Sequence, residues 1–358
     1  MTFYRFQKKW VELEIILLSE VQSKKCHKFS ELGNGLSSSV WVRTWLFPIV
    51  LISSHLLTGV PGLTAAHVWI SLPFCFMFFL ALTGNGALMS LIWTDHRLHQ
   101  PMFLFLARLS FVDLVLSLST LPKMLAIFWF GATAIHFHFC LFQMFLIHSF
   151  SAMESGVLVA MAFDRFVAIC NPLRYAITLT PGVVSKIGGL VVLRGVGLTL
   201  FFPILAQRLS FCGSHTIAYT YCEHMAVVKL ACGDTAVDSF YAFAVALFLG
   251  VGDMAFIAYS YGQIEKTVLH FPSPEARAKA SSTCTAHVCV ILFFYGPGFL
   301  SVVMQRFGPP TASSAKVLLV NLYLLFPPAL DPIVYGVKTK QIREHLFTII
   351  HPKWNQSH

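Results

Sequence analysis

Long apolar stretches alternate with short polar segments along the chain, and this pattern sets the first expectation about the fold. A helix needs about 20 apolar residues to cross the hydrocarbon core of a bilayer. Seven stretches are long enough: Val68 to Trp93, Met102 to Leu121, Phe139 to Val167, Val183 to Leu205, Phe240 to Tyr261, Ser281 to Met304, and Val317 to Tyr335. The pattern predicts an all-α membrane protein built as a seven-transmembrane helix bundle.

The distribution of Lys and Arg between the connecting loops predicts the orientation of the bundle. An odd number of spans puts the two termini on opposite sides, and cytoplasmic loops carry an excess of positive residues. With a cytoplasmic C-terminus, eleven Lys and Arg residues fall on the inner side, and four, Arg208, Lys229, Arg306 and Lys316, fall on the outer side. We therefore expect a multi-pass protein of the plasma membrane with an extracellular N-terminus.

Composition narrows the class of protein further. Of the 358 residues, 56% are hydrophobic and 11% are charged, whereas soluble proteins carry about 25% charged residues. So few charges cannot cover a water-facing surface, which excludes a soluble enzyme and a disordered chain. The net charge is +9, but the Lys and Arg residues form no basic stripe interleaved with polar or aromatic residues that could contact bases. We therefore expect no nucleic-acid partner. No P-loop or hydrolase signature occurs, so we expect no enzymatic activity.

Four of the nine cysteines lie on the expected outer side. Cys140 is near the start of the third span, and Cys212, Cys222 and Cys232 are in the long loop between the fourth and fifth spans. An oxidising compartment favours two disulfides, and the sequence leaves three pairings open. Because neighbouring Cys and His residues lack paired C-x-x-C spacing, we expect no zinc site.

The two ends of the chain differ from the spans. We expect residues 1–60 to be an atypical N-terminal extension that is disordered or stems from an upstream start codon. Its apolar run from Leu46 to Leu57 is short for a span and could also be signal-like. Residues 61–336 form the predicted seven-helix domain. Residues 337–358 form the cytoplasmic tail, in which a basic amphipathic segment predicts a short helix on the membrane surface.

Six sets of motifs occur in order, each in a matching span. They are Gly84-Asn85, Leu98–Leu106 with Leu109–Asp113, Met161–Cys170, Ser260-Tyr261, Lys279–Cys284 with His287, and Pro327–Gly336. Together they resemble the rhodopsin-like G-protein-coupled receptors, and more narrowly the olfactory receptors. The Pro61–Leu63 segment and the ten-residue spacing of the loop cysteines are similar to the class I (fish-like) branch. The resemblance covers Pro61 to Leu346.

The resemblance implies a function and a set of moving residues. An odorant receptor binds a small volatile ligand in the outer half of the bundle and activates a stimulatory heterotrimeric G protein, which raises cyclic AMP. Arg165, held by Asp164 at rest, would face the G protein in the active state. Tyr261, His287 and Tyr335 would rearrange around it.

The resemblance also implies the disulfide pairing, Cys140 with Cys222 and Cys212 with Cys232. The chain departs from the family pattern at Asp331, where Asn is usual, and at Phe166, where Tyr is common.

The ligand site is expected in the outer halves of the third, fifth and sixth spans and in the long loop. No acid that would bind an amine lies there, which disfavours a biogenic amine. A short carboxylic acid suits Arg306, whose planar guanidinium can bind both carboxylate oxygens. The alternative for Arg306 is an anchor at the membrane interface. The alternative for His148 is a core histidine whose hydrogen bonds are satisfied. The expected ligand-binding residues are Met144, His148, Ser151, His224, Phe243, Tyr295, Phe299, Val302 and Arg306.

Acidic residues inside the spans form a further candidate site. An ionised side chain at the bilayer centre costs roughly 2.5–3.5 kcal/mol, yet Asp113, Glu154 and Asp331 all lie in apolar helices. The resemblance places Asp113 and Asp331 on facing helices near Asn85. A bound cation, with Na⁺ as the expected one, or protonation would relieve the repulsion; the alternative is a static hydrogen-bonded network. Asp253 is a fourth acid without a recognisable partner.

Two other functions stay open. Buried acids can mark the ion path of a transporter, although no inverted repeat is visible. A receptor-like chain that does not signal is the second, if Asp331 or the extension prevents folding or export. The expected partners are an odorant, a heterotrimeric G protein and membrane lipid, with no cofactor other than a bound sodium ion.

Overall fold

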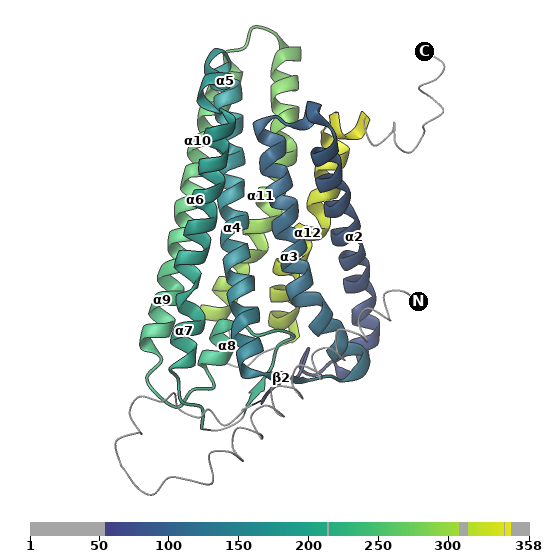
Figure 1. Ribbon diagram of the computed structural model, residues 1–358, viewed down its shortest axis with the longest axis vertical. Helices are drawn as coiled ribbons and strands as arrows, with labels where there is room; N and C mark the ends of the chain where they lie inside the picture. The colour runs from purple at the N-terminus through teal and green to yellow at the C-terminus, as the bar shows by residue number, and fades with distance from the viewer. Residues whose placement is uncertain (1–53, 213–214, 308–313, 340, 345–358) are drawn as a thin grey trace, which may run out of the picture.

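A computed structural model of the chain describes residues 54–212, 215–307, 314–339 and 341–344. Within these ranges, long helices run side by side in an elongated bundle (Figure 1). Seven candidate spans are long and apolar enough to cross a membrane. The predicted seven-helix fold is therefore confirmed, and the chain is a multi-pass membrane protein.

Five of the spans are single helices and two are interrupted. The single helices are α2 (His67–Thr94), α3 (Pro101–Phe130), α4 (Phe137–Cys170), α11 (Pro274–Phe307) and α12 (Ser314–Lys338). The fourth span consists of α6 (Pro181–Thr199) and α7 (Phe201–Gln207), and the fifth of α9 (Ala236–Leu247), the π-helical turn η5 (Phe248–Gly252) and α10 (Asp253–Leu269). Such π-helical turns occur often at functional sites, and this one ends directly before an intramembrane acid.

Short elements connect the spans. The 3-10 turns are η2 (Thr64–Ala66), η3 (His96–Leu98) and η4 (Pro172–Arg174), and the short helices are α5 (Tyr175–Thr178) and α8 (His224–Val228).

The third span is the central helix of the bundle. Of the most apolar stretch of this span, 67% is buried inside the bundle. The corresponding figure for the fifth span is 17%. Helix α4 contacts α3, α6, α10 and α11. A side chain on α4 can therefore reach the second, fourth, fifth or sixth span. Six of the predicted ligand, cation and coupling residues lie on this helix: Met144, His148, Ser151, Glu154, Asp164 and Arg165.

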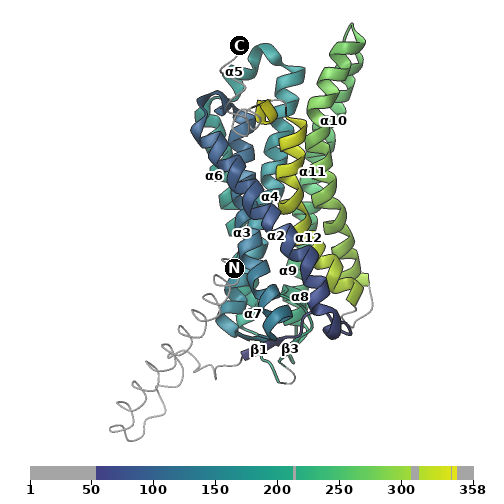
Figure 2. The same cartoon turned by 90° about the vertical axis from the view of Figure 1, so that its right-hand side faces the viewer.

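A three-stranded sheet covers one end of the bundle. Strand β1 (Ser54–Leu57) pairs with β2 (Ala134–His136) in antiparallel register and with β3 (Thr216–Ile217) in parallel register. Figure 2 shows β1 and β3 together below the helices, with α5 at the opposite end. We call these two ends the sheet end and the tail end.

The packed domain begins before residue 61. Leu57 and Val60 are fully buried, and the buried ring of His55 contacts Phe137 and Phe211 at centroid distances of 5.3 and 5.5 Å. Hydropathy does not reveal this boundary because β1 is held by backbone pairing with loops that are distant in sequence. Residues 1–53 lie outside the described ranges. Residues 341–344 are helical, and the rest of the expected amphipathic segment, from residue 345 on, also lies outside them.

Burial of β1 leads to a testable prediction. Leu57→Ala should destabilise the folded protein by about 2–5 kcal/mol, because it leaves a cavity beneath the sheet. The measurement is thermal unfolding of the detergent-solubilised protein, together with its surface level in cells. Leu56→Ala is the matched control, since Leu56 is 44% exposed. Equal stability of the two variants would mean that β1 is not part of the folded domain.

Candidate functional site

A cluster of aromatic rings lies between the third, fourth and fifth spans and the long loop. His148 of α4 and His224, the first residue of α8, pack on Phe202 of α7 with ring centroids 4.6 and 4.8 Å away. The two imidazoles are 6.2 Å apart, and Tyr241 of α9 lies 5.7 Å from Phe202. Two predicted ligand residues, one from a span and one from the loop, are thus brought together.

His224 has unused hydrogen-bonding capacity. Its side chain is 1% exposed, and neither ring nitrogen has a hydrogen-bond partner among the described residues. Burial, and secondly the proximity of His148, lowers the pKa of His224 to about 3. The imidazole is therefore neutral at physiological pH and offers one N–H donor and one lone pair.

The remaining predicted ligand residues differ in their surroundings. Met144 is fully buried in α4, while Ser151 and Phe243 are partly buried. Met144 belongs to the same hydrophobic core as Phe202. The side chain of Arg306 lies outside the described part of the chain, so its predicted role keeps the standing of a prediction.

Two residues of α11 do not face the interior. Phe299 is 73% exposed and Val302 is 39% exposed, so the prediction that they form walls of an interior pocket does not match their position. The buried stripe of α11 runs through Phe294 and Ser301, which are 5% and 4% exposed and lie two helical turns apart. Positions 299 and 302 lie off this stripe and face outward, where lipid would be.

Tyr295 belongs to a polar chain that crosses four spans. Its hydroxyl lies 2.7 Å from Oγ of Ser155 on α4, and Ser155 donates a hydrogen bond to Oδ2 of Asp253 on α10. Asp253 accepts from Arg194 of α6, with Nη1–Oδ1 at 2.6 Å and Nη2–Oδ2 at 3.0 Å. The acid without a recognisable partner therefore has one, and its charge is compensated inside the bundle.

Small residues make room for the arginine. A Cβ atom at Gly156 would lie 2.8 Å from Nη2 of Arg194, closer than real contacts allow. The same Nη2 donates to the backbone oxygen of Ala152 at 3.3 Å. Arg194 can therefore pair with Asp253 only when α6 is rotated so that the guanidinium lies against Gly156 and Ala152 of α4. Hydropathy does not encode this rotation.

An acidic cluster joins the second, third and seventh spans. Asp113 of α3, Glu154 of α4 and Asp331 of α12 are at most 1% exposed, and one carboxyl oxygen from each lies within 4.8 Å of the others. Both oxygens of Asp113 and Asp331, and Oε1 of Glu154, have no hydrogen-bond partner in the described ranges. Three carboxylates this close cannot all be ionised without a cation. Their oxygens are the ligand type that hard cations prefer.

Asn85 lies at the contact between the first and seventh spans. Its Nδ2 donates to the backbone oxygen of Pro328 at 2.8 Å and to that of Ala81 at 3.0 Å. Gly84 permits this approach, because a Cβ there would lie 2.6 Å from Cγ of Pro332. Asn85 therefore fixes the position of α12, the helix that carries Asp331.

A second charged pair lies at the tail end. Nε and Nη2 of Arg165 donate to Oδ2 of Asp164 at 3.0 and 2.6 Å, and the hydroxyl of Tyr175 in α5 donates to Oδ1 at 2.8 Å. Burial, followed by the Asp164 carboxylate, raises the pKa of Tyr175, which keeps this phenol a donor. The predicted contact between Asp164 and Arg165 is formed, and Tyr175 is a partner that the motif alone does not reveal.

The other three residues expected to rearrange on activation, Tyr261, His287 and Tyr335, lie in α10, α11 and α12. The hydroxyl of Tyr261 is 2.7 Å from Nδ1 of His287, which joins the fifth and sixth spans. Tyr335 is 1% exposed, and its hydroxyl has no hydrogen-bond partner among the described residues. Burial of an unsatisfied hydroxyl is unfavourable, so Tyr335 gains a partner in any rearrangement that exposes it to water or to a polar group.

Disulfides hold the long loop over the sheet end. Cys140 is bonded to Cys222 and Cys212 to Cys232. Both pairings implied by the family resemblance are therefore formed. The first bond ties the loop to α4, and the second closes the loop on itself, so the loop is ordered before any ligand binds.

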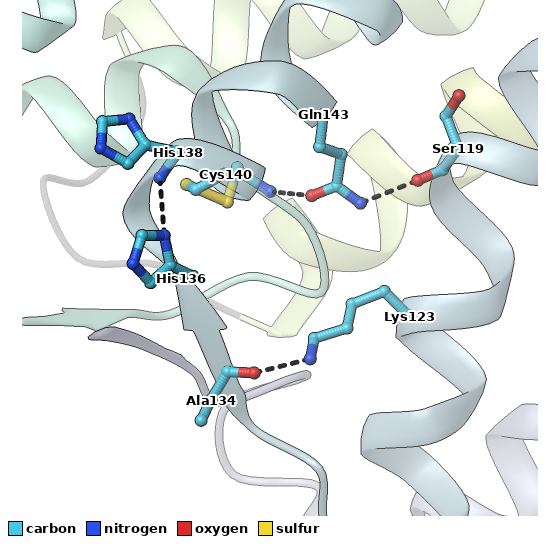
Figure 3. The surroundings of a disulfide bond; sticks show 8 residues. Ser119, Lys123, Ala134, His136, His138, Cys140 and Gln143 are labelled. Atoms are coloured by element: carbon cyan, nitrogen blue, oxygen red, sulfur yellow. Dashed lines mark hydrogen bonds between the residues drawn. A yellow bond between two sulfur atoms is a disulfide. The ribbon is translucent and has the colours of Figure 1, made fainter. Parts of the chain in front are cut away.

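Hydrogen bonds beside the first disulfide fasten the loop further. Oε1 of Gln143 accepts from the backbone N–H of Cys222 at 3.0 Å, and its Nε2 donates to the backbone oxygen of Ser119 at 2.8 Å (Figure 3). Nζ of Lys123 donates to the backbone oxygen of Ala134 at 2.6 Å. The loops are thereby joined to α3 and α4.

Comparisons with solved structures agree with this architecture. Squid rhodopsin superimposes with a TM-score of 0.64, covering 81% of each chain at 16% sequence identity. At this identity the likeness establishes the fold alone, a rhodopsin-like bundle of seven helices.

Comparisons with known sequences are more specific. The family model described as olfactory receptor matches residues 74–353. The human protein olfactory receptor 52K1 is 51% identical over 312 residues, which cover 86% of this chain and 99% of that protein. Human olfactory receptor 52K2 is 52% identical over 297 residues, covering 83% of this chain and 95% of that protein. These relatives are compatible with the class I branch. The chain belongs to the olfactory receptor family of rhodopsin-like G-protein-coupled receptors, which are signalling receptors and not enzymes.

Proposed function

We propose that this receptor lies in the plasma membrane with its sheet end outside the cell and its tail end in the cytoplasm. A small volatile ligand binds among the rings at the sheet end, and the receptor then activates a stimulatory heterotrimeric G protein, which raises cyclic AMP. The contact of Arg165 with Asp164 carries this proposal. It holds the guanidinium within the bundle, as a receptor at rest requires.

The ring cluster supports a ligand with one polar end. Phe202 and Tyr241 supply apolar surface, and the unpartnered nitrogens of His224 supply hydrogen-bonding groups. Because His224 is neutral, it does not by itself balance the charge of a carboxylate. For a short carboxylic acid, the compensating charge would come from Arg306, whose guanidinium can bind both carboxylate oxygens.

The acidic cluster supports a cation or proton switch in the same receptor. In the resting state a sodium ion, or protons, would compensate Asp113, Glu154 and Asp331. Movement of α12 on activation would pull Asp331 away from the other two carboxyl groups and weaken the site. Such coupling is reciprocal: a cation that favours the resting state lowers the affinity for an agonist.

One prediction from the proposed function concerns Arg165. Arg165→Ala should abolish the agonist-induced rise in cyclic AMP, because the G protein loses the cation exposed on activation. Surface expression, measured by antibody labelling of intact cells, should be largely unchanged. Arg97→Ala, an exposed arginine at the tail end, is the matched control and should signal normally. Normal signalling by Arg165→Ala would remove Arg165 from its assigned role.

The second prediction concerns the ligand class. Arg306→Ala should raise the EC50 for short carboxylic acids at least about tenfold, since a hydrogen bond to a charged group contributes roughly 1.5–3 kcal/mol. The EC50 for neutral alcohols and aldehydes should stay within about twofold. Arg208→Ala, another arginine at the sheet end that is exposed, serves as the control. A parallel loss of acids and neutral odorants, or no loss of either, would contradict the carboxylate hypothesis.

A further inference from the structure

A cavity of about 310 Å³ lies between α4, α6 and α10, away from the ring cluster. The residues that line it include Gly156, Val159, Ile187, Leu190, Arg194 and Phe256. All six lie within the candidate membrane spans. Leu190 and Phe256 are 65% and 42% exposed, so the cavity opens on the side of the bundle that lipid would cover and not toward water at either end.

Arg194 is the polar group of an otherwise apolar lining. Its charge is compensated by both oxygens of Asp253, and its Nη2 also reaches the backbone oxygen of Ala152. Its Nε is buried and has no hydrogen-bond partner among the described residues. These bonds use three of the five guanidinium N–H groups, so Nε–H and the second N–H of Nη1 remain on a side chain that is 22% exposed and whose charge is balanced by Asp253. A second anion would be repelled by Asp253, whereas a neutral acceptor would not.

We propose that this cavity is a second binding site, open to the bilayer, for a small neutral molecule with one hydrogen-bond acceptor on an apolar chain. Medium-chain alcohols, aldehydes and ketones have this chemistry. Ligand pockets span about 300–1,000 Å³, and a cavity at the lower limit fits such a molecule but not a lipid with two acyl chains. Because lipid tails are as apolar as the lining, the hydrogen bond to Arg194 decides which molecule binds.

A molecule bound in this cavity is linked to the interior of the bundle through Arg194. The same guanidinium continues through Asp253 and Ser155 to the hydroxyl of Tyr295 on α11. A molecule that contacts Arg194 therefore contacts the polar chain that joins the third, fourth, fifth and sixth spans. The site is distinct from the ring cluster and acts on the same helices from the membrane side.

Photolabelling tests the proposal directly. The full chain is reconstituted in phosphatidylcholine nanodiscs and irradiated with octanol that carries a diazirine, and adducts are located by mass spectrometry. Adducts are expected at Val159, Ile187 and Phe256. Excess octanol should reduce them at least about fivefold, and octane at the same membrane concentration should reduce them less than about twofold.

Two tryptophan variants supply the matched control. Leu190→Trp places a large ring at the opening of the cavity and should reduce the labelling at least about fivefold. Leu193→Trp, on the same helix and 70% exposed but outside the lining, should leave it unchanged. Adducts spread evenly over the lipid-facing helices, labelling that Leu190→Trp does not reduce, or competition by octane equal to that by octanol would each overturn the proposal. Because binding is read directly, the outcome does not depend on G-protein coupling.

Discussion

An ionisable side chain away from water inside a membrane bundle is stable only when a counter-charge, an ion or a proton neutralises it. The arrangement of the spans in this receptor follows from that constraint at two places. Arg194 compensates Asp253 where α4, α6 and α10 meet. The second place has no such partner: Asp113, Glu154 and Asp331 converge from three helices, and five of their six carboxyl oxygens lack hydrogen bonds within the described ranges.

These two sites connect different parts of the bundle. The compensated pair is bonded through Ser155 to Tyr295, so it links the spans beneath the ring cluster to the sixth span. The uncompensated cluster lies between the second, third and seventh spans, and the third span also carries the Asp164–Arg165 contact. Interfaces of this kind switch between discrete packings and do not deform continuously, which agrees with the proposal that the ligand and the G protein bind at opposite ends.

Hydropathy and motifs predict most of this fold because membrane spans and family motifs are local features of the sequence. The seven helices, both disulfides and the Asp164–Arg165 contact are present as expected. Features that depend on how helices rotate, or on pairing between distant segments, are not local. The Arg194–Asp253 pair, the outward position of Phe299 and the strand at Ser54–Leu57 belong to this second group. Hydropathy also underestimates helix length, since α10 continues past Tyr261 to Leu269 through a more polar segment.

The acidic cluster tests the central claim most directly, because its charge must be balanced in the resting receptor. Agonist potency for G-protein activation is measured in membranes with sodium replaced by choline at constant ionic strength, for the unmodified chain and for Asp113→Asn. We expect sodium to raise the EC50 of the unmodified receptor several-fold and to have little effect on the variant, when both reach the surface equally. An EC50 of the unmodified receptor that is independent of sodium would contradict the sodium switch.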